Sequence, residues 1–223
     1  PSPMTHNIDW YPDTDWVFTP AQERSRNSLE KVLRAAKTLF LDKGFEETTI
    51  TEVSKLSGVS VGSIYHRFAD KQAILQTVLE GYRRTRYAQV QELVEPERWA
   101  GRTLREVLEF HIEVIFSATA RDAAIYRLIE RQRMVSPRVN EQVAAWDHEI
   151  CELLLGLYRA RAGSLDADEL TARVKLLHNL VRGAALWSSL GAGPRHHFLD
   201  VEDGDHQARV TALALNYLGL VPD

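Results

Sequence analysis

Residues 48–75 constrain this chain more than any other stretch, because they predict two short helices joined by a tight turn. Gly58 suits the left-handed backbone position that closes a helix, and Ser60 suits the cap that opens the next one. Thr49 and Glu52 form a capping box at the start of the first helix. Such a turn sets the second helix across the first, in the geometry that lets it enter a DNA major groove. The segment therefore predicts DNA binding.

Length and cysteine usage narrow the class of protein. The 223 residues allow one large domain or two small ones with a hydrophobic core. The single cysteine, Cys151, excludes an internal disulfide framework and cannot make a structural zinc site alone. We therefore expect a reducing, cytoplasmic setting. No apolar run approaches the roughly 20 residues that a membrane span needs, so we expect no membrane partner.

Charge is divided unevenly along the chain, although the net charge is only −4. Residues 21–87 carry 12 Lys and Arg against 8 Asp and Glu, a balance of +4, which leaves −8 for the remainder. A basic segment on an acidic body fits a protein in which one face meets phosphates.

Apolar residues recur at helical spacing along the chain, and no segment has the alternation of a strand. The pattern predicts an all-α protein of about nine helices. The expected helices cover about 20–43, 50–57, 61–68, a long stretch from 71, 103–120, 122–135, 137–163, 168–190 and 206–218. We expect an N-terminal arm over residues 1–18, a helix-turn-helix domain over 19–70 and a second helical domain over 71–223.

The third expected helix presents polar and small residues outward, while Ile64 and Phe68, four residues apart, are expected to face the core. Hydroxyl groups and a lysine ammonium near a helix N-terminus can bind phosphate oxygens, and Gly62 allows a close approach to the groove. The expected DNA-contacting residues are Thr49, Ser60, Val61, Gly62, Ser63, Tyr65, His66 and Lys71. A plain helical hairpin with a polar surface is the alternative interpretation.

This region resembles the TetR-type (tetracycline repressor-like) transcriptional regulators over roughly residues 29–80. The matching residues are Ala35-Ala36, Leu39-Phe40, Gly44-Phe45, Thr48-Thr49-Ile50, Gly58-Val59-Ser60, Gly62-Ser63-Ile64-Tyr65, Phe68, Lys71 and Leu75. Two departures from the family pattern bear on the operator sequence. They are Ser54-Lys55-Leu56-Ser57, in place of alanine-rich text, and the basic pair His66-Arg67.

The resemblance implies a homodimer whose N-terminal domains bind a double-stranded DNA operator. It also implies that a small-molecule effector enters the C-terminal helical domain and releases the DNA, with no cofactor. Residues 71–223 would then bind the effector and dimerise, the helices at 168–190 and 206–218 pairing across the dimer. By position, the phosphate contacts would be Thr49, Tyr65, His66 and Lys71, and the base contacts would be Val61 and Ser63.

Aromatic and polar residues of the second domain are candidates for the effector pocket. They are Phe110, His111, Phe116, Tyr126, Met134, Trp146, His178 and Trp187. An aromatic residue at helical spacing is more often ordinary core, and His111 fits a hydrogen-bonded core histidine. As a set they predict a mostly apolar cavity with few polar anchors, and hence a hydrophobic effector.

The sequence does not favour an enzyme or a metal site. His196-His197 stand near several acidic residues and His206, but without the fixed helical spacing of a dedicated metal site. Acidic neighbours of Cys151 disfavour its thiolate, and no catalytic constellation accompanies it. Two further alternatives keep the fold. One is an activator or a DNA binder without an effector. The other is a protein-interaction dimer with an inactive DNA face, which Tyr65 and Lys71 disfavour.

Overall fold

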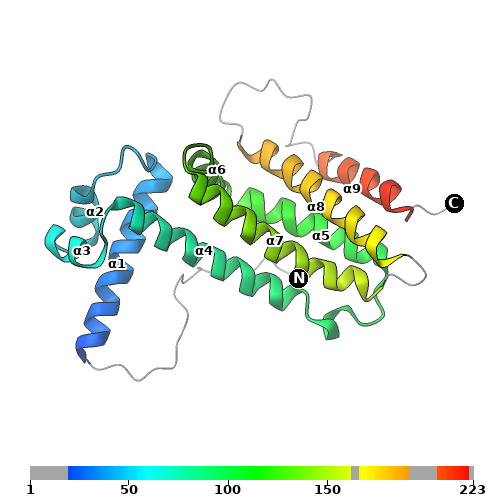
Figure 1. The fold of residues 1–223 in the computed structure, drawn as a ribbon, viewed down its shortest axis with the longest axis horizontal. Coiled ribbons are helices and arrows are strands. Elements are labelled where there is room, and N and C mark those ends of the chain that lie inside the picture. The colour runs from blue at the N-terminus through cyan, green and yellow to red at the C-terminus, as the bar shows by residue number, and fades with distance from the viewer. Residues whose placement is uncertain (1–19, 162–165, 191–204, 221–223) are drawn as a thin grey trace. The chain divides into compact units, whose positions relative to one another are not determined.

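The computed structural model describes residues 20–161, 166–190 and 205–220. Within these residues every regular element is helical, which confirms the all-α prediction (Figure 1). The elements are α1 (Pro20–Asp42), α2 (Ile50–Ser57), α3 (Val61–Arg67), α4 (Lys71–Leu93), the 3-10 helix η1 (Pro96–Trp99), α5 (Leu104–Arg121), α6 (Ala123–Val135), α7 (Pro137–Arg159), α8 (Ala167–Leu190) and α9 (Asp205–Leu218). The N-terminal arm and most of the histidine-rich stretch at 195–206 lie outside the described residues.

The chain divides into two compact units between Ala88 and Gln89, a point inside α4. Helix α4 therefore begins in the first unit and ends in the second. No described helix combines the length and apolar character that crossing a lipid bilayer requires.

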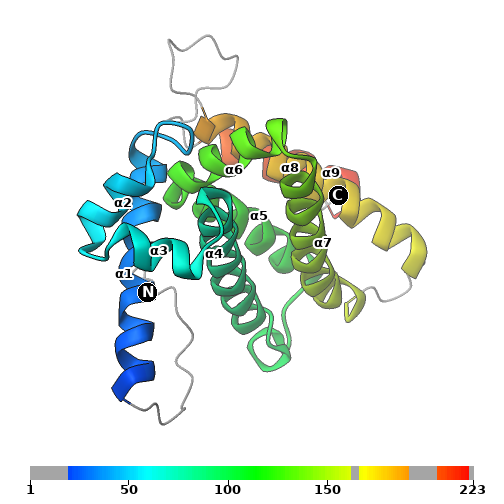
Figure 2. The ribbon, with the colours of Figure 1, turned by 60° about the vertical axis from the view of Figure 1, so that its left-hand side comes forward.

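In the first unit, α2 packs against both α1 and α3, and Figure 2 shows these helices gathered together. Phe40 from α1, Val53 from α2 and Ile64 from α3 are buried in its core, together with Phe68 after α3. The predicted inward orientation of Ile64 and Phe68 is confirmed. Burial of these side chains fixes which face of α3 is left to the solvent.

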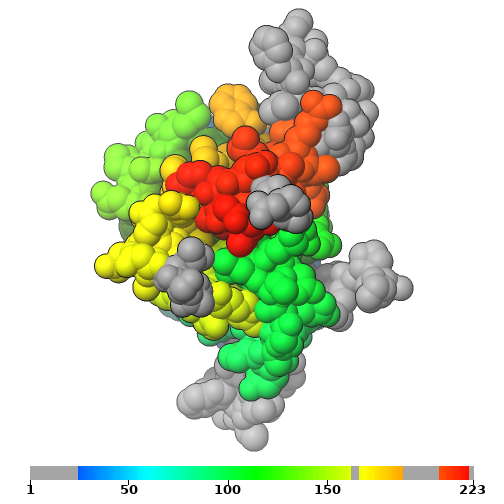
Figure 3. All heavy atoms as spheres, turned by 90° about the vertical axis from the view of Figure 1, so that its right-hand side faces the viewer, coloured from blue at the N-terminus to red at the C-terminus, as the bar shows by residue number. Residues whose placement is uncertain are grey.

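In the second unit, α8 packs against α5, α6, α7 and α9, and it is the helix around which this unit is built. Helix α9 packs against α5 and α8, and Figure 3 shows it at the surface beside parts of both. Apolar residues from α5, α7, α8 and α9 form one buried core cluster, which continues to Trp99 in η1.

Helix η1 was not predicted from the sequence. It is held by Trp99, which is buried, stacks at 4.7 Å between ring centroids against Phe110, and donates its indole N–H to the carbonyl of Leu93 at 2.8 Å. Arg161 donates to the carbonyls of Trp99 and Arg102. These contacts join distant parts of the chain, so local sequence does not reveal them.

Helix boundaries follow side-chain caps. Thr103 and Glu106 form a capping box at α5, and the Asp70 carboxylate accepts the N–H of Ala73 at 2.7 Å at the start of α4. At the start of α8, the Asp166 carboxylate accepts the N–H of Glu169 at 2.8 Å. Helix α7 ends at Arg159, earlier than the expected end near residue 163.

Candidate functional site

The turn between α2 and α3 has the geometry that the sequence predicts. The Thr49 hydroxyl accepts the N–H of Glu52 at 3.3 Å, and the Glu52 carboxylate accepts the N–H of Thr49 at 2.9 Å, which completes the capping box. Gly58 closes α2 with φ 69°, in the left-handed region, and donates its N–H to the carbonyl of Ser54. The Ser60 hydroxyl accepts the N–H of Ser63 and so caps α3. Two short helices are thereby held on a three-residue turn.

The outward face of α3 carries the predicted DNA-contacting residues of that helix. Val61, Gly62, Ser63, Tyr65 and His66 are all exposed, and more than half of the Tyr65 side chain (53%) is open to solvent. The exposed Val61 and Tyr65 give this seven-residue helix one apolar and one polar side chain that could contact a DNA groove.

Several groups on this face have hydrogen-bonding capacity to spare. The Ser60 and Ser63 hydroxyls lie 2.9 Å apart, so one donates to the other and the second keeps its hydrogen for an outside acceptor. Within the described part of the chain, the Tyr65 hydroxyl and the His66 ring take part in no hydrogen bond. A Cβ added at Gly62 would meet nothing within 4 Å. The face is thus open both to hydrogen bonding and to close approach.

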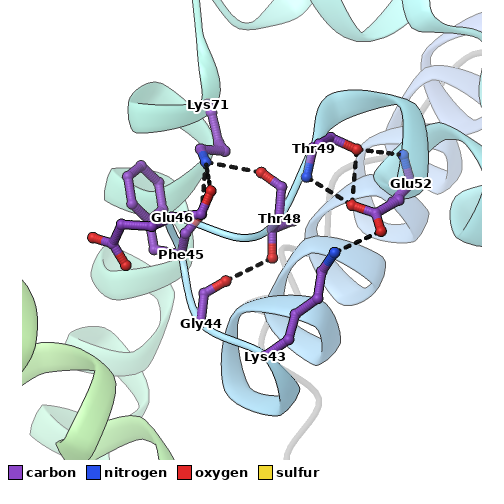
Figure 4. A network of polar contacts seen from close by, with 8 residues as sticks. All are labelled: Lys43, Gly44, Phe45, Glu46, Thr48, Thr49, Glu52 and Lys71. Carbon is purple, nitrogen blue, oxygen red and sulfur yellow. Dashed lines mark hydrogen bonds and ion pairs between the residues drawn. The ribbon is translucent and has the colours of Figure 1, made fainter.

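Thr49 differs, because its hydroxyl is engaged on both sides. It donates to the Glu52 carboxylate at 2.8 Å and accepts from the Glu52 N–H, as Figure 4 shows. The Lys43 ammonium, 2.5 Å from the same carboxylate, is the largest cause that lowers the pKa of Glu52 to about 2, followed by the bonds from Thr49. For Thr49 to donate to phosphate, its hydroxyl must exchange this partner.

Lys71, the first residue of α4, is more fully engaged still. Its ammonium donates to three backbone carbonyls of the loop before α2, at 2.6 Å to Phe45, 3.0 Å to Glu46 and 2.8 Å to Thr48 (Figure 4). The Phe45 ring lies 4.4 Å from the same nitrogen. The prediction that Lys71 binds phosphate remains untested, and in this structure its three N–H donors are occupied.

This helix-turn-helix segment matches a known family. Residues 32–78 fit the model for bacterial regulatory proteins of the tetR family. The helix-turn-helix segment is thus of the type found in tetR-family regulators.

Individual relatives agree with that assignment. The HTH-type transcriptional repressor BepR of Brucella suis is 30% identical over 113 residues, which cover 51% of this chain and 49% of BepR. The chain thus spans about half the length of this curated relative. Among solved structures, Salmonella enterica GusR has a TM-score of 0.65 at 22% identity, covering 91% of this chain and 98% of GusR. The TetR-family repressor FadR of Thermus thermophilus, in complex with lauroyl-CoA, has a TM-score of 0.57 at 24% identity, covering 87% and 95%. These structural likenesses show a shared fold.

The second unit contains a buried chain of hydrogen-bonded polar side chains. The Nδ1 atom of His111 on α5 is 2.9 Å from the hydroxyl oxygen of Tyr158 on α7. The Nε2 atom of the same ring is 2.9 Å from Nδ1 of His178 on α8. All three residues are buried. Burial, with a smaller contribution from the neighbouring imidazole, lowers the pKa of His111 to about 3. Burial, with a contribution from Arg182, lowers the pKa of His178 to about 4, so both rings are neutral at pH 7.

Of the eight effector-site candidates, the structure brings His111 and His178 into contact. The other six do not gather around them. Phe110 packs on Trp99, and Phe116 packs at 5.6 Å on buried His206. Tyr126 and Trp146 are half-buried, whereas Met134 and Trp187 are exposed by 87% and 72%. Their role in ligand binding remains a prediction.

Sequence reasoning missed Tyr158, the third member of the polar chain. The sequence does contain an indication of it, because Tyr158 stands in the apolar run that ends α7, and a tyrosine hydroxyl buried there needs a hydrogen-bond partner. It also missed the ion pairs of Arg182 on α8 with Asp147 on α7, at 2.5 Å, and with Glu130 on α6, at 3.8 Å. Burial outweighs the attraction of Arg182 and raises the pKa of Asp147 to about 6. Burial, aided by Glu152, also raises the pKa of the Cys151 thiol to about 11, which disfavours a thiolate nucleophile.

Proposed function

We propose that this protein is a homodimeric transcriptional repressor that binds a pseudo-palindromic DNA operator through α3 and leaves it when a small, hydrophobic effector binds. The observation that carries the proposal is the outward face of α3. Ile64 is buried and holds the helix in the core. The other five residues between positions 61 and 66 are exposed to solvent. Two such helices, one from each copy, would enter successive major grooves about 34–36 Å apart.

Contacts to DNA divide by chemistry. Val61, Gly62 and Ser63, at the leading end of α3, are proposed to meet base edges, where a methyl group and a hydroxyl can discriminate between base pairs. Thr49, Ser60, Tyr65 and His66 are proposed to donate to phosphates, contacts that fix register without reading sequence.

Dimerisation is proposed to use an exposed apolar stripe on α8 and α9. Leu176, Leu180 and Trp187 recur along α8 at spacings of four and seven, and Leu213 and Tyr217 are four apart on α9. Exposed apolar residues gathered on adjacent helices are typical of a protein interface.

The dimer has a direct test. Leu213→Asp should convert a dimer into a monomer in light scattering, because a carboxylate would be buried at the interface. Met134→Asp is the matched control, since Met134 is an even more exposed apolar residue on α6. A Leu213→Asp protein that stays dimeric would contradict this interface.

The effector is proposed to enter the second unit and to be mostly apolar. Support comes from a core in which Tyr158, His111 and His178 supply neutral polar groups among apolar side chains. FadR of Thermus thermophilus, which has the same fold, holds lauroyl-CoA. Binding would favour a dimer in which the spacing of the two α3 helices no longer fits the operator.

Selection of bound duplexes from a random DNA pool, at near-physiological salt, tests the function as a whole. We expect a two-fold symmetric motif. Ser63→Ala should change the selected motif more than the general affinity, because Ser63 is proposed to contact base edges. A folded dimer that enriches no sequence would overturn the proposal of a sequence-specific repressor.

A further inference from the structure

We propose that Lys71 is a positioning residue, which sets the N-terminus of α2 relative to α4 and does not itself bind phosphate. The inference rests on the proposed DNA-binding function and changes the role of one residue within it. It starts from the three carbonyl oxygens of Phe45, Glu46 and Thr48, which converge on one ammonium.

The ammonium has no donor left for DNA. A lysine ammonium carries three N–H groups, and each of the three carbonyls takes one at 2.6–3.0 Å. The Phe45 ring adds a cation–π contact at 4.4 Å. A phosphate oxygen could bind Lys71 only by displacing a carbonyl, and for the part-buried bonds to Phe45 and Thr48 this would leave the carbonyl without its cation.

The loop that Lys71 binds leads directly into the candidate DNA-binding helices. Thr48 is buried, and its hydroxyl donates to the carbonyl of Gly44 at 2.7 Å. The next residue, Thr49, is the N-cap of α2. Lys71 therefore links the first residue of α4 to the residue before that cap, and α3 follows α2 after only three residues.

Three carbonyl dipoles that point at one site repel each other when no cation lies between them. Without Lys71 the loop from Phe45 to Thr48 would turn its carbonyls outward to water and shift the start of α2. The effect on DNA binding would come from misplaced helices and not from a lost phosphate contact. Phosphate contacts would then fall to groups such as Tyr65 and His66, whose side chains form no hydrogen bond with any residue that the structure describes.

Arginine separates the two roles. An arginine at position 71 keeps the charge and is at least as good a ligand for phosphate, but its planar fork cannot direct three N–H groups at a convergent tripod of carbonyls. We expect Lys71→Arg to lower affinity for the selected operator at least ten-fold, with unchanged helix content by circular dichroism. Lys31 is the matched control: it is exposed on α1 and, within the described residues, pairs with no acceptor. Lys31→Arg should bind as the wild type does.

Amide hydrogen exchange on the free protein supplies a second readout that needs no DNA. In both Lys71→Arg and Lys71→Met, the N–H groups of Glu52 and Val53, which bond to Thr49 at the start of α2, should exchange at least ten-fold faster than in the wild type. In Lys31→Met they should exchange at the wild-type rate. If Lys71→Arg binds operator as tightly as wild type and exchanges at the wild-type rate, the positioning role is wrong. A wild type that selects no operator would instead contradict the proposed function, and exchange would still decide the role of Lys71 in placing α2.

Discussion

In the first unit, the polar contacts that shape the candidate DNA-binding face lie at or near the surface, and their partners are from three to 42 positions apart in sequence. In the second unit, the polar chain of His111, Tyr158 and His178 is buried, and its partners are 47 and 67 positions apart. Thr49 and Glu52 are three residues apart, and Lys71 reaches back about 25 residues to its loop. His111, by contrast, meets Tyr158 and His178 at separations of 47 and 67 residues.

The difference shows what each set of polar groups can do. Surface groups exchange partners with water at little cost, so the first unit can offer them to DNA. Buried groups must stay satisfied, and an unpaired one strongly destabilises the fold. The second unit should therefore respond to changes in its polar chain through stability, and the first unit through DNA affinity.

The largest effect is expected from His111→Ala. The substitution removes a buried ring and leaves the Tyr158 hydroxyl and the His178 ring without their partner. Unfolding in urea should show a loss of about 3 kcal/mol or more. His148→Ala, at an exposed position on α7, should change stability by less than about 0.5 kcal/mol. Equal effects of the two variants would remove the contrast between buried and surface polar groups.

The pH dependence of stability tests the neutral state of the buried histidines. Below the ordinary histidine pKa of about 6.5, each ring binds a proton in the unfolded chain but not in the folded one, so the free energy of unfolding falls as pH falls. Asp147 acts in the opposite sense between pH 4 and 6, because its raised pKa keeps a proton on the folded protein. Between pH 6 and 5 the two histidines each take up a proton on unfolding and Asp147 releases one, which leaves a net uptake of about one proton. The free energy of unfolding of the wild type should therefore fall by about 1.4 kcal/mol per pH unit in this range.

Asp147→Asn sharpens this test. With the opposing carboxyl removed, the loss of unfolding free energy between pH 6 and 5 should become about twice as steep, whatever the variant's stability at pH 7. Urea unfolding at half-unit pH intervals measures it. A slope that is the same in both proteins would mean that Asp147 is not the group that offsets the histidines.

Gly62→Ala should separate folding from DNA binding in the first unit. The added methyl group meets nothing in the protein, so stability should rise by up to about 1 kcal/mol through helix propensity. Affinity for the selected operator should nevertheless fall about ten-fold, since the methyl group would lie between α3 and the groove. Gly156→Ala, at an equally open helical position in the second unit, should raise stability and leave DNA affinity unchanged. Undiminished binding by Gly62→Ala would show that α3 does not approach DNA at this point.

The smallest expected change is at the turn. Gly58 has φ 69° and open space around it, so Gly58→Ala meets no clash and only forces alanine into the left-handed region. The cost should be about 1 kcal/mol in unfolding experiments. A neutral result would indicate that the turn relaxes away from the left-handed conformation.

The same contrast explains how far the sequence could be interpreted. The capping box at Thr49, the left-handed Gly58 and the cap at Asp70 were predictable because each is specified within a few residues. The third member of the buried chain, Tyr158, was not, since its contact requires the relative placement of α5 and α7. Lys71 shows a third case: its residue type was recognised, but a lysine beside a phosphate and a lysine within a cage of carbonyls look alike in sequence.

The hydrogen bonds around the loop before α2 also have a consequence for recombination within the gene. Those drawn in Figure 4 fall between Lys43 and Lys71, and Arg67 reaches Ser25 on α1. The parts that hold α3 in place are therefore consecutive in the gene. A crossover within the codons of α4, beyond its first turns, would move α1, α2 and α3 together onto another helical domain. A crossover between α2 and α4 would separate Lys71 from the carbonyls it gathers.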